Sequence, residues 1–225
     1  MKLVLTLFTF LTFVSFGQDT KSQAILDDLS KKIKAHTSFY MEFSANIKNT
    51  STGTDENETG KGWVKGDKYY ASFGDNTIIS NGKKTWTVVK EEKTVYEADA
   101  DEEGDDMMNP KKLMTIWESG FKNKYGKEKQ LNGEAIHEIY LYPKSPGSVD
   151  YHTVVLYISK TKNELKKVLL KMKDGTRMTY RLTNYTANPE IKDSKFIYEA
   201  KKYPGYTVVR DNWDQIGVKI KSPLI

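Results

Sequence analysis

Short turn dipeptides divide most of this chain into segments in which apolar and polar residues alternate. Asn81-Gly82, Asn132-Gly133 and Asp174-Gly175 are typical of tight β-hairpin turns, because these residue types tolerate the positive φ angles that such turns need. One face of the strand expected at residues 39–47 carries five apolar residues, namely Phe39, Met41, Phe43, Ala45 and Ile47. The chain is therefore predicted to be mainly β, with antiparallel strands in a barrel or a strongly curved sheet.

The same patterns predict about a dozen strands and two amphipathic helices. Beyond residues 39–47, strands are expected at 58–65, 68–73, 76–80, 84–90, 93–98, 122–130, 134–142, 151–159, 165–173, 176–186, 195–199 and 206–210. One helix is expected over residues 20–37, and another begins at Asn109-Pro110, where proline suits the first helical turn. The second helix carries the apolar residues Leu113, Met114, Ile116, Trp117 and Phe121. Periodicity alone does not distinguish helices that plug an open barrel end from helices that cover a binding site.

The first 17 residues are predicted to be a cleavable signal peptide. Lys2 precedes an apolar run from Leu3 to Phe16 that lacks acidic residues and is shorter than the roughly 20 residues of a membrane span. Small residues at positions 15 and 17 place cleavage before Gln18. A retained anchor helix is disfavoured because no stop-transfer charge cluster follows directly. We expect a soluble protein exported to the periplasm, with the signal peptide at 1–17, one domain at 18–211 and a C-terminal tail at 212–225.

The residues needed for most catalytic and metal-dependent chemistry are missing from the sequence. The 225-residue chain has no cysteine, which excludes a disulfide scaffold, a Cys-ligated zinc site, a thiol nucleophile and a lipid anchor on cysteine. Its three histidines are far apart, and the serine-hydrolase, P-loop and dinucleotide-binding motifs are absent. The acidic run from Asp99 begins like a calcium loop, but Pro110 occupies the position of the bidentate glutamate. We therefore expect no catalytic residue, no metal site and no cofactor, in a protein that is not an enzyme.

The composition fits a carrier of apolar cargo better than an enzyme. Apolar residues make up only 38% of the chain, yet aromatic residues make up 12%, as in a thin shell with polar outer faces and a lined hollow. Methionines such as Met41 and Met178 would give an adaptable lining for an acyl chain. The formal net charge of +5 is spread thinly along the chain, so it gives no argument for nucleic acid.

Several short motifs occur in a specific order along the chain. They are Gly60-Lys-Gly-Trp63-Val64-Lys65, Ser80-Asn81-Gly82-Lys83 with Trp86, Asn109-Pro110, Leu141-Tyr-Pro-Lys144 and Asp193-Ser-Lys-Phe196. In this order they resemble the periplasmic outer-membrane lipoprotein carrier family, LolA, over about residues 22–211. The resemblance implies an incomplete, half-open antiparallel β-barrel of about eleven strands, capped by helices and containing an apolar cavity.

The resemblance also implies a function and a set of partners. Members of the family accept acylated lipoproteins from an inner-membrane lipoprotein-releasing ABC transporter and pass them to an outer-membrane acceptor. The acceptor has a similar fold but is anchored through a cysteine, so the absence of cysteine favours the soluble carrier. We expect a monomer that binds no nucleic acid.

Combined with the strand pattern, the resemblance assigns two groups of site residues. The cavity is expected to be lined by Met41, Phe43, Ala45, Ile47, Trp86, Val88, Ile139, Leu141, Leu170 and Met178. The lid over it is expected to use Ile25, Leu29, Leu113, Met114, Trp117 and Phe121.

The chain departs from the family at one position that matters for the lid. Family members have an arginine directly after Trp-Val-Lys that bonds to the lid and helps to hold the empty form closed, but this chain has Gly66 followed by Asp67. Either Lys65 or Lys68 replaces that arginine, or the lid is held differently. Two alternatives therefore stay open: a carrier of the same fold for another lipid or apolar molecule, and a lipid-sensing or partner-binding module without transport.

Overall fold

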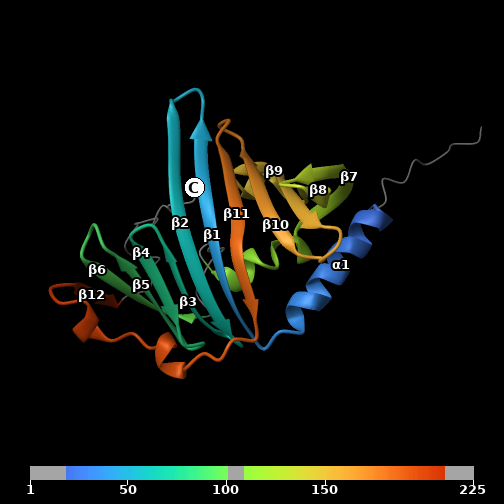
Figure 1. Ribbon diagram of the computed structural model, residues 1–225. Coiled ribbons are helices and arrows are strands. Elements are labelled where there is room, and N and C mark those ends of the chain that lie inside the picture. Colours follow the sequence, from blue (N-terminus) through green and yellow to red (C-terminus); the bar gives the residue numbers. More distant parts are fainter. Residues whose placement is uncertain (1–18, 101–108, 211–225) are drawn as a thin grey trace, which may run out of the picture.

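Twelve strands form one continuous sheet in the computed structural model, which describes residues 19–100 and 109–210 (Figure 1). They are β1 (Ser38–Asn49), β2 (Thr54–Lys65), β3 (Lys68–Phe73), β4 (Asn76–Ser80), β5 (Lys84–Val89), β6 (Thr94–Asp99), β7 (Phe121–Leu131), β8 (Glu134–Pro143), β9 (Tyr151–Ser159), β10 (Leu165–Met172), β11 (Arg177–Ala187) and β12 (Thr207–Arg210). The described helical elements are α1 (Thr20–Lys34), α2 (Pro110–Leu113), and the 3-10 turns η2 (Ile116–Glu118), η3 (Pro146–Ser148), η4 (Asp193–Phe196) and η5 (Ala200–Lys202). The predicted signal peptide and the tail at 212–225 lie outside the described residues.

The strand order shows that the sheet is an open barrel. It runs β12-β6-β5-β4-β3-β2-β1-β11-β10-β9-β8-β7, with every neighbouring pair antiparallel except β12 and β6, which are parallel. Asn132 and Gly133 both have positive φ, at 51° and 79°, and form the tight turn from β7 to β8. Because β12 and β7 stand at opposite ends of this order, the fold class predicted from the sequence is confirmed, with twelve strands rather than about eleven.

The sheet has one continuously apolar face, which we call the inner face. It is the face that carries Phe39, Met41 and Ala45 on β1, and these residues belong to the main apolar cluster. Bulges bend the strands, at Thr183 on β11 opposite Glu42 and Phe43, and between Tyr125 and Glu128 on β7. The opposite side, which we call the outer face, has a smaller apolar cluster on β8 and β9, formed by Ile136, Val155 and Tyr157. The inner face therefore carries the larger apolar surface that elements outside the sheet must cover.

Helix α1 lies across the inner face and is fixed at its start to the edge strand β7. Its buried residues Leu26, Leu29 and Ile33 recur at helical spacing and join the main cluster. The N-cap carboxylate of Asp19 accepts hydrogen bonds from the Lys21 and Ser22 amides, and also from the amide of Tyr125 on β7 at 2.9 Å. The last of these bonds does most to lower the pKa of Asp19. One carboxylate thus both starts the helix and attaches it to the sheet.

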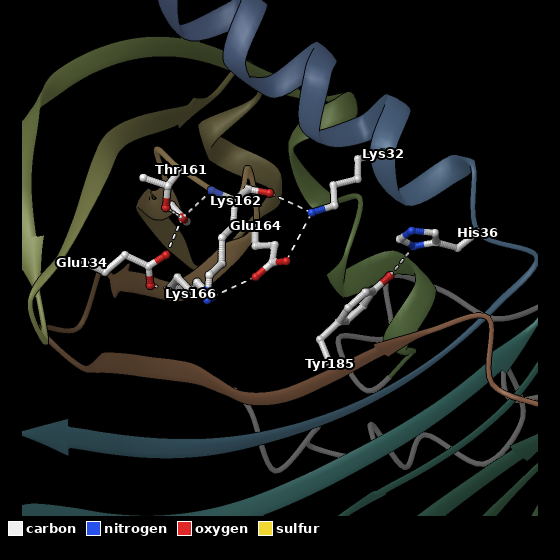
Figure 2. A network of polar contacts seen from close by, with 9 residues as sticks. Lys32, His36, Glu134, Thr161, Lys162, Glu164, Lys166 and Tyr185 are labelled. Atoms are coloured by element: carbon white, nitrogen blue, oxygen red, sulfur yellow. Dashed lines mark hydrogen bonds and ion pairs between the residues drawn. The ribbon is translucent and has the colours of Figure 1, made fainter.

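The C-terminal half of α1 is held by a separate polar network, shown in Figure 2. Lys32 donates to the Lys162 carbonyl at 2.7 Å and pairs with Glu164 at 3.2 Å, both in the connection from β9 to β10. Just beyond the helix, Nδ1 of His36 lies 2.8 Å from the hydroxyl of Tyr185 on β11. The helix is therefore attached at both ends. Of all the helices in the described ranges, none combines the length and apolar character needed to cross a membrane.

The segment between β6 and β7 is less helical than its sequence predicts. The predicted helix start is correct, since the side chain of Asn109 caps the Lys111 amide at 2.9 Å and Pro110 opens α2. However, α2 is a single turn that ends at Leu113, followed by the 3-10 turn η2. The predicted long helix was wrong because β-branched Thr115 and Ile116 favour helix weakly, and because Phe121 is taken up by β7.

Residues 188–206, between β11 and β12, cover the outer face of β2 to β6, and we call them the C-terminal segment. Phe196 has no exposed surface, and Lys195 places its ammonium 3.7 Å above the ring of Trp63 on β2. The strand expected at residues 195–199 was wrong, because η4 turns there and directs Phe196 into the sheet. The carboxylate of Asp193 pairs with Lys65 at 2.7 Å and with Lys68 at 2.8 Å, which fixes the segment to the turn between β2 and β3.

This double ion pair predicts a low carboxyl pKa. Hydrogen bonds from Lys65 and then Lys68 lower the pKa of Asp193 to about 2. Because the folded pKa lies below the unfolded value of about 3.9, the contribution to stability is complete above that pH and is lost as the pH falls through about 2. NMR titration of the carboxyl carbon should show this low pKa in the wild type and a higher one in Lys65→Met. The variant Lys90→Met, which breaks an unrelated ion pair with Asp75, should leave it unchanged.

Candidate functional site

The inner face brings together most of the residues expected to line a cavity. Met41, Ala45, Ile139, Leu141, Leu170 and Met178 are buried members of the main cluster, and Phe43 and Ile47 pack against it from partly exposed positions. The register places these side chains on one side, because β1 pairs with β11 at Ile47 and Met178, and β11 pairs with β10 at Met178 and Leu170. Eight of the ten expected lining residues therefore share one apolar wall.

Trp86 and Val88 do not belong to that wall, and placing them there was wrong. Trp86 pairs with Ile79 and Val88 with Thr77, whereas the inner-face residue on β4 is Ile78, opposite Thr87. The indole of Trp86 donates to Glu97 at 3.0 Å and stacks on Tyr198 of the C-terminal segment. On β5 the alternation is reversed: Thr85 and Thr87 share the inner face with Ile78, whereas the apolar Trp86 and Val88 are on the outer face. The C-terminal segment covers that outer face, and local spacing does not contain this information.

The wall also contains residues that the sequence did not single out. They are Val154, Leu156 and Ile158 on β9, Leu165 and Val168 on β10, and Tyr180 on β11. β9 is buried on both faces, by the main cluster inside and by Val155 and Tyr157 outside. The sequence of such a strand does not alternate between apolar and polar residues, so it does not indicate which side chains face inward. The signal for Val168 and Tyr180 was the alternation of β10 and β11, because they lie two positions from the expected lining residues Leu170 and Met178 and so share their face.

The six expected lid residues all lie against this wall. Leu29 of α1, together with Leu113, Met114, Trp117 and Phe121, is buried in the main cluster, and Ile25 packs against it from a partly exposed position. Phe121 belongs to β7 rather than to a lid helix. We call α1 and residues 109–118 together the lid. The buried side chains of the lid pack on the inner face in this structure, and we call this arrangement the covered state.

Two glycines on β2 make the fit between wall and lid possible. A Cβ on Gly60 would lie 2.2 Å from the Phe43 ring, so this glycine lets that ring lie against the strand. A Cβ on Gly62 would lie 2.7 Å from Cγ of Pro110, the first residue of α2. The two glycines of the Gly-Lys-Gly-Trp sequence therefore leave space on the inner face for the Phe43 ring and for Pro110 at the start of α2.

The polar contacts of the lid answer the question raised by Gly66. Lys65 and Lys68 bind Asp193 and not the lid. Instead, Asp67 pairs with Lys111 of α2 at 2.7 Å, so the acid is on the barrel and the base is on the lid. Both side chains are more than half exposed, and such pairs contribute little to stability.

A second polar contact joins the two parts of the lid. The indole N–H of Trp117 donates to the Ser30 hydroxyl of α1 at 2.8 Å, while the ring is 5% exposed. Lys34 of α1 also pairs with Glu118 at 2.7 Å. Residues 109–118 are thus held by apolar contact with the wall, by bonds to α1 and by the Asp67–Lys111 pair, whereas α1 has polar bonds of its own to the sheet.

The outer face carries polar groups with structural roles. Glu138 is 1% exposed; burial raises its pKa, but hydrogen bonds from Lys129 and Tyr140 outweigh this and lower it. A cavity of about 480 Å³ lies between the C-terminal segment and the sheet, beside Tyr40, Trp63 and Lys195. Within residues 19–100 and 109–210, no group of three or more acidic or histidine side chains is placed to hold a metal ion.

Comparison with known proteins agrees with this arrangement. Residues 18–175 match the sequence model of the family described as outer membrane lipoprotein carrier protein LolA. The chain belongs to the LolA family. The resemblance noted in the sequence is therefore confirmed, and it includes α1, the lid and the strands from β1 to β10. Among proteins of curated function, no sequence matches this chain.

Solved structures of related fold have little sequence in common with this LolA family member. An uncharacterized conserved protein from Thermus thermophilus has a TM-score of 0.56 at 11% identity, over 85% of this chain and 100% of its own. LprF from Mycobacterium bovis has a TM-score of 0.46 at 14% identity, over 78% and 98%. A LolA superfamily protein from Nitrosomonas europaea has 0.41 at 11%, over 78% and 97%. At such identities, the first of these similarities speaks for the fold alone.

The close approach at Gly62 predicts a variant with a loosened lid. In Gly62→Ala the new methyl group meets the rigid Pro110 ring, so α2 must move away from β2. We expect the free energy of unfolding to fall by about 1–3 kcal/mol and the binding of an apolar dye such as ANS to rise. Gly147→Ala is the matched control, because a Cβ there meets nothing within 4 Å. Equal dye binding by the two variants would contradict the steric role of Gly62.

The contrast between the apolar and ionic contacts of the lid is also testable. Trp117→Ala removes a buried ring and its bond to Ser30, and should lower the free energy of unfolding by about 3–5 kcal/mol. Asp67→Asn removes the exposed pair with Lys111 and should leave chemical denaturation curves unchanged within error. A larger loss in Asp67→Asn than in Trp117→Ala would show that the ion pair, and not packing, holds the lid.

Proposed function

We propose that this protein is a soluble periplasmic carrier that binds the acyl chains of lipoproteins on its inner face and moves them from the inner to the outer membrane. The observation that supports this most directly is the cover itself: apolar side chains from α1 and residues 109–118, which lie outside the sheet, pack on an apolar wall. An acyl chain needs the same kind of surface that the lid occupies. The proposed acyl-binding residues are those of the wall, from Met41 and Phe43 on β1 to Leu141 on β8.

The energetics favour exchange of the lid for lipid. Each methylene removed from water contributes about 0.8 kcal/mol, so one acyl chain contributes on the order of 10 kcal/mol. When the lid leaves the wall, apolar lid residues such as Leu113 and Trp117 become exposed to water. The free energy of that exposure is also hydrophobic in origin, and it opposes opening. Because the two terms offset one another, cargo is held in water and can still be released. A rigid closed cavity would lack this balance.

The polar contacts are consistent with a lid that opens in part. α1 is attached at both ends by Asp19, Lys32 and His36, whereas α2 contacts the barrel through the exposed Asp67–Lys111 pair. We propose that residues 109–118 move first and that α1 follows or stays. In this carrier the donor would be an inner-membrane lipoprotein-releasing transporter and the receiver an outer-membrane acceptor. The carrier itself needs no catalytic residue.

Photocrosslinking in cells tests the acyl-binding surface. A p-benzoylphenylalanine at Phe43, on the inner face, should capture acylated lipoproteins, because its ketone would lie beside their chains. The same residue at Tyr142, which is 40% exposed, is the matched control and should capture none. Both replace one aromatic side chain by another, so both variants are expected to fold.

Depletion of the protein distinguishes transport from other uses of the same site. Under our proposal, lipoproteins accumulate in the inner membrane when the protein is depleted. Crosslinks at Phe43 to a free lipid alone, without lipoprotein accumulation, would replace this proposal by a carrier of another apolar molecule. A stable protein partner without any bound lipid would instead favour a partner-binding module.

A further inference from the structure

One side chain in the apolar wall has a polar atom without a partner. Tyr180 of β11 is 4% exposed, and among the residues that the structure describes its hydroxyl has no hydrogen-bond partner. Buried hydroxyl groups are almost always hydrogen-bonded, since leaving one unpaired costs much of what a hydrogen bond contributes. An unpaired hydroxyl on the apolar wall therefore needs a physical explanation.

The surroundings of Tyr180 explain why it has no partner in the covered state. Its cross-strand neighbours are Ala45 on β1 and Val168 on β10, and the ring of Phe43 meets it edge-on with centroids 6.1 Å apart. None of these side chains can accept a hydrogen bond. Burial also raises the pKa of Tyr180, so the hydroxyl keeps its proton and remains a donor. It is a donor held among hydrocarbon groups.

Other tyrosines of the molecule show that this is not the general rule. Tyr185, on the same strand and face, has its hydroxyl 2.8 Å from His36 Nδ1, and Tyr125 has its hydroxyl 2.9 Å from His137 Nδ1. In the described part of the chain, Thr85 Oγ1 is the other buried side-chain atom without a partner. Thr85 lies on β5, five positions from β11 in the strand order, and so away from the centre of the wall.

We propose that the Tyr180 hydroxyl donates a hydrogen bond to the carbonyl oxygen of an ester- or amide-linked acyl chain when cargo replaces the lid. This rests on the proposed function and deepens it, because it assigns the ligand class. The wall would recognise acyl groups, which bring a carbonyl, and not hydrocarbon chains in general. A carbonyl oxygen accepts one such bond without carrying a charge into the apolar wall.

With this assignment, the unpaired hydroxyl also contributes to the exchange of the lid for cargo. In the covered state the donor has no partner among residues 19–100 and 109–210, which weakens the covered state relative to the loaded one. Binding of an acyl carbonyl satisfies the donor, so ligands with that group gain an advantage over alkyl ligands of equal length. Removing the hydroxyl should therefore weaken discrimination between ligands and not the fold.

The test compares two lipids on two proteins. The probes are a fluorescent lipopeptide with ester-linked palmitoyl chains and its analogue with ether-linked hexadecyl chains, which lacks the carbonyls. We expect the wild type to bind the ester about fivefold to tenfold more tightly than the ether, and Tyr180→Phe to bind both with the affinity of the ether. The thermal midpoint of the empty Tyr180→Phe protein should be unchanged or higher, because it loses only an unpaired group.

Tyr185→Phe is the matched control. It removes a hydroxyl from the same strand and face, but one that already has a partner, so the ester-to-ether ratio should stay at the wild-type value. An unchanged ratio in Tyr180→Phe, with both lipids still bound, would overturn this inference alone. A lowered thermal midpoint in the same variant would also overturn it, by showing that the hydroxyl has a partner in the empty protein. Failure of the wild type to bind either lipid would overturn the proposed function as well.

Discussion

The structure depends on one unmet requirement: an open barrel cannot bury its own apolar inner face. A closed barrel or a sandwich supplies a second wall, but here β12 and β7 stand at opposite edges of the sheet. The missing wall is supplied by α1 and residues 109–118, whose buried side chains complete the cluster. The apolar cluster is therefore completed by elements outside the sheet, which distinguishes this fold from a closed barrel.

Other features of the molecule make that cover fit the wall. Gly60 and Gly62 hollow β2 so that Phe43 and Pro110 can approach it. Polar bonds hold α1 at its two ends, at Asp19 and at Lys32, and leave its middle to apolar contact. On the other side of the sheet, Asp193 and Phe196 fix the C-terminal segment, which keeps that side covered independently of the lid.

The departure from the family arginine shows how such a fold tolerates changes in its polar contacts. Where relatives are expected to place a base on the barrel, this chain has Gly66 followed by Asp67, and the base is Lys111 on the lid. An exposed ion pair such as Asp67–Lys111 contributes little to stability, so the fold can change contacts of this kind at little cost. Most of the holding force comes from Trp117, Leu113 and their apolar neighbours, which do not depend on charge.

The sequence by itself determined the strands, the tight turns, the family and the alternating faces, because these follow from local spacing of residue types. It also identified β1 and β8 as wall strands, since Met41 and Ile139 alternate with polar neighbours. It did not determine which face of β5 is inward, nor that 195–199 turns instead of pairing, because both depend on the C-terminal segment covering the outer face. Only the tertiary structure showed that the Tyr180 hydroxyl has no hydrogen-bond partner among the described residues. Whether a buried hydroxyl is hydrogen-bonded depends on which side chains fold against it, and no local sequence pattern contains that information.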